Sequence, residues 1–192
     1  MISIITAPNP ILSQSAKQIP KVNLNILKLI KDMEEALLAA KDPEGVGLAA
    51  PQVGKSLQIF LAKPSLKSPI LIFINPVITQ KNAEQNAERR KRSSASGSAK
   101  FRDSETKLEG CLSLPNIWGE VDRSSQITLS YQDNKGNPHK RIFKGFIATV
   151  IQHEADHLDG ILFPKRVFEQ KGKLYKSRKN KKGEDVFEKI EI

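Results

Sequence analysis

The chain has 192 residues, of which 39% are hydrophobic, and it carries 31 Lys and Arg against 21 Asp and Glu, for a formal net charge of +10. This length favours a single domain that can bury a sizeable core, and no apolar run approaches the roughly 18 residues that a membrane-spanning helix needs. One cysteine excludes a disulfide within the chain and suits a reducing compartment.

The first predicted element is a helix over residues 24–40, which stops before Asp42 and Pro43. Five apolar side chains recur in it at helical spacing: Leu24, Leu27, Ile30, Met33 and Leu37. We expect this face to cover a core rather than to bind a partner.

A glycine-rich segment follows at residues 44–54, with the sequence EGVGLAAPQVG. Gly45 and Gly47 would let the backbone approach a ligand closely, and the Gln52 amide is a suitable donor to a developing oxyanion. The segment lacks the Gly-Lys-Ser/Thr ending of a phosphate loop. A glycine-rich turn with an exposed Gln52 is the alternative.

Four short segments then predict strands, at residues 57–62, 70–74, 127–131 and 140–143. The last two flank a turn at residues 133–138, which predicts a hairpin. Residues 79–107 are polar and include the basic cluster Arg89–Arg92, a composition that favours a flexible surface loop. A lid near Cys111 or a contact for acidic RNA is the alternative.

Residues 146–158 predict a second helix, which ends at Gly160 in a capping position. It contains His153, Glu154 and His157 in the pattern His-Glu-x-x-His. Because side chains four residues apart share a helix face, the two histidines can hold one metal ion. Glu154 lies about 100° around the helix, near enough to act on water held by the metal. The alternative is a buried helix with two hydrogen-bonded histidines and a solvated glutamate.

Catalytic metal sites of this kind keep three protein ligands, so one ligand has to come from elsewhere. No histidine follows His157, and the acidic residues after it lie in a charged tail: Glu169, Glu184, Glu188 and Glu191. The single cysteine, Cys111, stands in the segment EGCLSLP at residues 109–115 and could supply a thiolate. A small buried hydrophobic side chain is the alternative for a lone cysteine.

Taken together and in this order, the three segments resemble the peptide deformylase family. The family pattern is Gly-x-Gly-x-Ala-Ala-x-Gln, then Glu-Gly-Cys-x-Ser, then Gln-His-Glu-x-Asp-His, and it is matched without a departure at residues 45–52, 109–113 and 152–157. The resemblance covers about residues 2–168 and includes residues 7–12 and the strand end at residues 74–76. It implies an α+β fold, with antiparallel β-sheets wrapped around a central metal-binding helix.

The resemblance implies hydrolysis of N-formylmethionyl nascent peptides, with release of formate. It implies three ligands to one divalent metal ion: Cys111, His153 and His157. The affinity order of such a site favours Zn over Fe, whereas the resemblance implies Fe(II) in the cell, with Zn, Ni or Co possible. Glu154 would be the general base on metal-bound water, and the Gln52 side chain and the Leu112 N–H would stabilise the oxyanion.

Further residues are expected around these groups. Those expected to contact substrate are Gly45, Gly47, Gly110, Thr149 and Val150. The peptide backbone would pair with the edge near Gly45–Gly47 by β-strand addition, so that side chains beyond methionine matter little. Asp156 points away from both histidines on a helix, so we do not expect it to be a ligand. The resemblance places Arg123 on a neighbouring strand, and we expect Asp156 to pair with it. We expect Glu109 to hold the Cys111 loop or a histidine from behind. A core position for Val150 and a surface salt bridge for Asp156 are the alternatives.

For the organisation of the chain, we expect a catalytic domain over residues 1–168, with residues 79–107 as an insertion, and a basic C-terminal extension over residues 169–192. Nine of the 18 residues from 165 to 182 are basic, and such a patch can bind nucleic acid by counterion release. The resemblance allows a ribosome contact through this extension. A solvated basic tail is the alternative.

The opening residues 1–6 are too short for a signal-peptide core, and Pro8 follows at once. We expect no transit peptide, and therefore a place in the bacterial cytoplasm. We also expect a monomer with no membrane contact. Two other classes of protein stay open. One is a metallopeptidase that uses the same helix and does not need Cys111, and the other is a basic RNA-binding protein with a structural metal.

Overall fold

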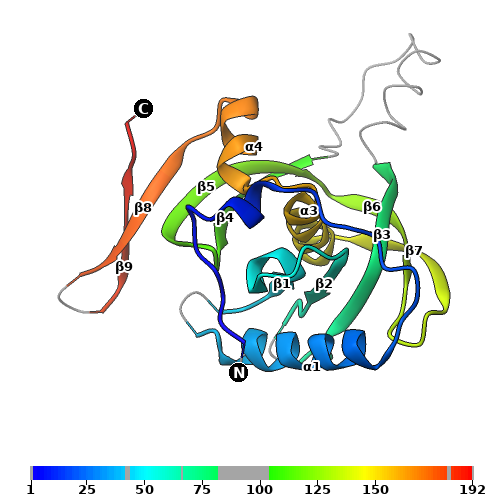
Figure 1. Cartoon of the computed structure of the whole chain (residues 1–192). Helices are drawn as coiled ribbons and strands as arrows, with labels where there is room; N and C mark the ends of the chain where they lie inside the picture. The colour runs from blue at the N-terminus through cyan, green and yellow to red at the C-terminus, as the bar shows by residue number, and fades with distance from the viewer. Residues whose placement is uncertain (1, 42–43, 66, 82–103, 181–182, 192) are drawn as a thin grey trace, which may run out of the picture.

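The computed structural model describes the chain apart from residues 1, 42–43, 66, 82–103, 181–182 and 192. It has an α+β fold in which two antiparallel sheets flank the helix α3 (Phe146–Leu158) (Figure 1). The expected fold class, with antiparallel sheets around a central helix, is confirmed. Among the described residues, no helix has both the length and the apolar character needed to cross a membrane.

The described strands form a five-stranded sheet and a four-stranded sheet. The larger has the order β1-β2-β3-β6-β7, with β1 at Gly47–Ala49, β2 at Ile59–Ala62, β3 at Leu71–Lys81, β6 at Gln126–Gln132 and β7 at Pro138–Lys144. The smaller has the order β4-β5-β8-β9, with β4 at Ser104–Cys111, β5 at Leu114–Ser124, β8 at Leu174–Lys179 and β9 at Asp185–Lys189. The predicted hairpin of residues 127–131 and 140–143 is confirmed as the antiparallel pair β6–β7.

Two other α-helices and two short 3-10 helices complete the described fold: α1 at Leu24–Ala39, α4 at Phe163–Gln170, η1 at Pro10–Ser13 and η2 at Ala50–Val53. Helix α1 begins where Asn23 Oδ1 accepts a hydrogen bond from the Ile26 N–H at 3.1 Å, a regular N-cap. The predicted helices at residues 24–40 and 146–158 are both confirmed.

Strand β2 is buried on both faces and so links the two main parts of the core. Ile59 and Leu61 pack in the cluster that includes the buried face of α1. Phe60 and Ala62 point the other way, into the cluster that includes α3, because successive side chains of a strand alternate between faces. Through this double burial, α3 sits against a rigid sheet.

The strands extend further than the sequence predicts. Strand β3 continues past the expected strand end at residues 74–76, with a shift of register between Ile74 and Val77. The expected loop at residues 79–107 is wrong at both ends, because β3 runs to Lys81 and β4 begins at Ser104. The rest of that loop, including Arg89–Arg92, lies outside the described residues.

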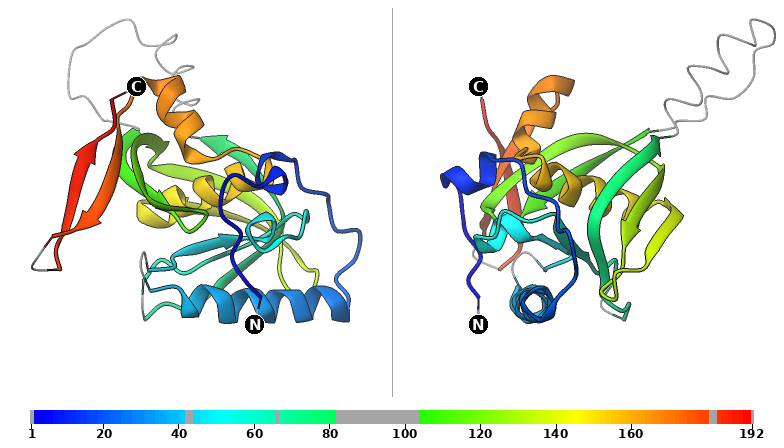
Figure 2. Two further views of the ribbon diagram at one scale, coloured as in Figure 1. Left: turned by 60° about the vertical axis from the view of Figure 1, so that its left-hand side comes forward. Right: turned by 45° about the vertical axis from the view of Figure 1, so that its right-hand side comes forward.

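The C-terminal extension is also built into the fold rather than left as a solvated tail. Strands β8 and β9 form a hairpin beside the body of the molecule, and β8 pairs with β5 (Figure 2). Leu174 of β8 is buried in a cluster with Phe163, Val167 and Cys111. The extension therefore contributes to the core on which a candidate metal ligand rests.

Asn75 fixes the N-terminal segment to the bulge in β3. Its backbone has φ of +48°, and its side chain accepts a hydrogen bond from the Ile19 N–H and donates one to the Ile19 carbonyl, both at 2.8 Å. Asparagine suits this position because it tolerates the left-handed region and carries both a donor and an acceptor.

We expect Asn75→Ala to lower the free energy of unfolding by about 1–3 kcal/mol, since it removes both hydrogen bonds to Ile19. Urea titration followed by circular dichroism measures the loss. Asn75→Gly is the control, because glycine accepts the backbone conformation but also lacks the side chain. Parental stability in Asn75→Gly would contradict the role given to the hydrogen bonds.

Candidate metal centre

Helix α3 presents its two histidines on one side, as the spacing predicts. Gly145, with φ of +64°, precedes the helix, and Gly160, with φ of +70°, follows it. The ring centroids of His153 and His157 are 5.1 Å apart. His157 is buried, and the side chain of His153 is 11% exposed.

The end of β4 brings Cys111 to this pair. The distance from Cys111 Sγ to His157 Nε2 is 3.2 Å, and the donor atoms of Cys111, His153 and His157 all lie within 4.8 Å of one another. These three side chains form a group that could hold one metal ion. The structure thus brings together the cysteine and the histidine pair, which were predicted from separate parts of the sequence.

The electrostatics of Cys111 suit a metal ligand. Burial opposes a charge on the thiol, but the neighbouring His157 and His153 outweigh burial and lower the pKa of Cys111 to about 5. A thiolate is therefore the stable form near neutral pH. One thiolate and two imidazoles form a donor set that fits Zn, Fe, Co or Ni.

A network of charged side chains holds His153 on the side of its ring that faces away from Cys111. His153 Nδ1 lies 2.9 Å from Glu109 Oε2, so the Nε2 side of the ring is left to face Cys111. Arg123 donates to both oxygens of Glu109, at 2.9 and 3.0 Å, and donates to Asp156 at 2.6 Å. Burial opposes the charge of Glu109, yet the hydrogen bonds from His153 and Arg123 lower its pKa to about 2. The expected Asp156–Arg123 pair is present and buried, which excludes the surface alternative.

One further member of this group of charged side chains, Arg166, was not predicted from the sequence. Arg166 of α4 donates two hydrogen bonds to Asp156, at 2.7 and 3.1 Å. It stands ten residues after Asp156 across the break between α3 and α4, so no helical spacing connects the two. Its one signal in the sequence was its place in a basic run, which indicates a solvated charge.

Glu154 lies on the inner face of the site, against β1. It is 3% exposed, and its Oε2 has no hydrogen-bond partner among the described residues. A Cβ atom added to Gly47 would collide with Glu154 Oε1, so glycine at this position is what lets the carboxylate approach the strand. Burial raises the pKa of Glu154 to about 7. The alternative of a solvated Glu154 is excluded.

Gln52 is buried and points its amide toward the same place. Its Oε1 accepts a hydrogen bond from the Ala49 N–H at 2.8 Å. Its Nε2 therefore faces Ser113 Oγ at 3.1 Å and Cys111 Sγ at 3.5 Å. With 1% exposure, Gln52 does not fit the alternative of a turn with an exposed side chain.

A cavity of about 340 Å³ opens onto these groups. Among its lining residues are Gly47, Gly110, Leu112, Thr149 and Val150, all predicted from the sequence. Gly45 does not belong to the lining. A Cβ at Gly45 would collide with the Leu37 carbonyl oxygen in α1, so helix packing explains this glycine.

A thiolate and two imidazoles beside a buried carboxylate, at the floor of a cavity, are the arrangement of a mononuclear metallohydrolase. The family model of polypeptide deformylase matches residues 1–173. The chain belongs to this family.

Relatives and solved structures agree with the match. Peptide deformylase of Pelotomaculum thermopropionicum is 41% identical over 160 residues, which cover 83% of this chain and 87% of that protein. Peptide deformylase 1 of Bacillus cereus is 36% identical over 167 residues, covering 87% and 92%. The peptide deformylase structure from Thermotoga maritima has a TM-score of 0.71 at 33% identity and covers 86% of this chain and 97% of that one. The structure from Synechococcus elongatus, a complex with actinonin, has a TM-score of 0.70 at 32% identity, covering 86% and 78%.

We expect Glu109→Gln to weaken metal binding by about 10- to 100-fold, because the charged partner of His153 is lost. Competition with a chelator, with Zn(II) as the probe, measures the affinity. Asp156→Asn is the matched control, since it disturbs the same Arg123 without touching a histidine. It should lower stability and change the affinity by less than about threefold. Equal affinities in the two variants would contradict the role of Glu109.

Proposed function

We propose that this chain hydrolyses the N-formyl group of formyl-methionine at the start of newly synthesised proteins, releasing formate and a free amino terminus. The observation that carries the proposal is the meeting of Cys111, His153 and His157 beside the buried Glu154, in a chain of the polypeptide deformylase family. The family match also argues against the two other classes, a metallopeptidase and an RNA-binding protein with a structural metal.

Glu154 would move the protons of the reaction. A divalent ion held by Cys111, His153 and His157 would lower the pKa of a water molecule and stabilise the negative charge that develops on the formyl oxygen. Glu154 would accept the proton of the attacking water and later pass it to the leaving amine. The position of Glu154 supports this role, because its carboxylate lines the cavity and lies against Gly47.

Gln52 and the Leu112 N–H would stabilise the oxyanion. The argument for Gln52 is its orientation, since the bond from Ala49 occupies Oε1 and directs the amide N–H groups toward the site. Leu112 follows Cys111 directly and lines the cavity. Preorganised donors of this kind need no rearrangement as charge develops.

The cavity has a wall suited to the methionine side chain. Thr149 and Val150 line it from α3, one turn before His153. Among the described strands, β1 pairs with β2 alone, so its outer edge at Gly47 can take up the peptide backbone by β-strand addition. A formyl carbon carries only hydrogen, and a narrow floor at the metal ligands would exclude larger acyl groups.

For the metal, we propose Fe(II) in the cell, with Zn, Ni or Co able to occupy the same ligands. The mixed thiolate and imidazole set accepts all four. We further propose a catalytic domain over residues 1–168 and an extension over residues 169–192 that packs onto it.

We also propose a monomer in the bacterial cytoplasm. The single cysteine is a candidate metal ligand that must stay reduced. The large exposed apolar side chains of the described residues belong to seven different helices and strands.

The basic extension is proposed to contact the ribosome. Lys171, Lys173 and Lys176 are exposed, and the hairpin β8–β9, which carries part of this charge, projects from one side of the molecule (Figures 1 and 2). Exposed lysines on a projecting element suit binding to phosphates.

The test of the activity is formate release from formyl-Met-Ala-Ser by protein loaded anaerobically with Fe(II). The parent should release formate, and Glu154→Gln should lose at least about 100-fold in rate while keeping its metal. Glu35→Gln, on the exposed surface of α1, is the matched control. No release from a folded, metal-loaded parent would refute the proposed function, and near-full activity of Glu154→Gln would refute the base.

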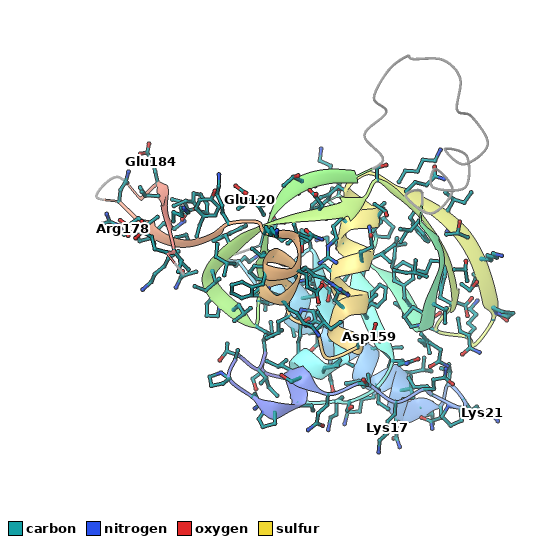
Figure 3. The ribbon with its side chains drawn as sticks, turned by 90° about the horizontal axis from the view of Figure 1, so that it is seen from above. Lys17, Lys21, Glu120, Asp159, Arg178 and Glu184 are labelled. Atoms are coloured by element: carbon teal, nitrogen blue, oxygen red, sulfur yellow. The ribbon has the colours of Figure 1, made fainter. Side chains whose placement is uncertain are left out.

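For the ribosome contact, we expect the triple change of Lys171, Lys173 and Lys176 to Gln to weaken co-sedimentation with ribosomes by about tenfold, because three charges are lost. The same change of Lys17, Lys21 and Lys28 is the control, since Lys17 and Lys21 lie far from the hairpin end marked by Arg178 (Figure 3). Substitution is preferable to deletion of the extension, which would remove the buried Leu174. Unchanged co-sedimentation in the first variant would remove the docking proposal.

A further inference from the structure

Trp118 stands in the wall of the cavity, next to the metal ligands. It lies on β5 directly opposite Gly110 of β4, and Gly110 precedes Cys111. A Cβ atom added to Gly110 would come within 3.0 Å of two ring carbons of Trp118. The indole therefore lies closely against the backbone that leads into the site, and the glycine makes room for it.

The other side of the indole is held by the C-terminal hairpin. Trp118 Nε1 donates a hydrogen bond to Ser177 Oγ of β8 at 3.1 Å, and Ser177 is 8% exposed. Phe187 of β9, the cross-strand partner of Ser177, meets the indole edge to face, with centroids 5.6 Å apart at 86°. A polar and an aromatic contact together fix one orientation of the ring.

The hairpin is firmly tied to the same part of the molecule. Leu174 is buried and Ile190 half-buried in the cluster that contains Cys111, and the Ile190 N–H donates to the Leu174 carbonyl at 2.9 Å. Tyr175 donates from its hydroxyl to Glu120 at 2.6 Å, so β8 is also held to β5 by a side chain. The orientation of Trp118 thus depends on residues beyond 173, where the family match ends.

Two other large apolar side chains line the same cavity. Leu108 and Phe146 line it and are 43% and 47% exposed. Large apolar side chains that stay exposed around a cavity mouth are typical of a surface that receives an apolar ligand. Trp118 adds an aromatic face to this mouth.

We propose that Trp118 is a specificity-determining residue, which contacts an apolar side chain in one of the two residues that follow formyl-methionine, and that Ser177 and Phe187 are the residues that position it. The inference rests on the proposed function. It revises the expectation that side chains beyond methionine matter little. The C-terminal hairpin is then part of the substrate site as well as a basic surface.

The test compares formate release from formyl-Met-Ala-Ser with release from formyl-Met-Phe-Ser and formyl-Met-Ala-Phe. The parent should favour a phenylalanine peptide by about threefold to tenfold in kcat/KM, mainly through KM, as expected for one aromatic contact. Trp118→Leu should abolish the preference, and Ser177→Ala and Phe187→Ala should reduce it. Glu188→Ala is the control, because Glu188 adjoins Phe187 in β9 but pairs with Arg178 and should keep the preference.

Trp118 is the single tryptophan of the chain, so its fluorescence reports the indole without turnover. Ser177→Ala and Phe187→Ala should shift the emission to longer wavelength, and Glu188→Ala should not. Formate release without any peptide preference, or a preference that survives in Trp118→Leu, would overturn the inference and leave the proposed function intact. Formate release from none of the peptides would overturn the proposed function and, with it, the specificity role.

Discussion

The approach of the Cys111 thiolate to the imidazoles of α3 is the contact on which the rest of this structure depends. It joins the end of β4 to His157, near the C-terminal end of α3 and 46 residues later in the chain, at 3.2 Å. A lone thiolate would be costly to bury, and two histidines at its side make the charged form stable. Both sheets serve this contact, since one carries the cysteine and the other supports the helix.

The buried charges around α3 act as a scaffold rather than as a separate feature. Arg123 would be costly to bury alone, but it is paired with Glu109 on one side and with Asp156 on the other. Because Glu109 also meets His153, the same pairing that neutralises the arginine orients a candidate ligand. Removing one of these charges takes a partner away from its neighbour, so geometry at the site and stability of the fold are coupled.

Each wall of the cavity depends on a different long-range contact. Because Gly47 has no side chain, Glu154 can pack closely against β1. Because Gly110 has none, Trp118 can pack closely against the backbone beside Cys111. The N-terminal segment is hydrogen-bonded to η2 and to the turn after β4: the Ile5 N–H donates to the Gln52 carbonyl, and the Ala7 N–H donates to the Ser113 carbonyl. The C-terminal hairpin closes the other side through Trp118, so both ends of the described chain shape the site.

The sequence by itself determined the helices at residues 24–40 and 146–158, the His-Glu-x-x-His pair and the family, because helical periodicity and short motifs are local signals. It did not reveal β4, β5, β8 or β9, whose charged faces lack a clear alternation and whose partners lie far along the chain. Nor could it assign Arg166 or Trp118, since their roles arise from contacts across elements. Only the tertiary structure decided these, because strand pairing and the burial of charge depend on which distant groups meet.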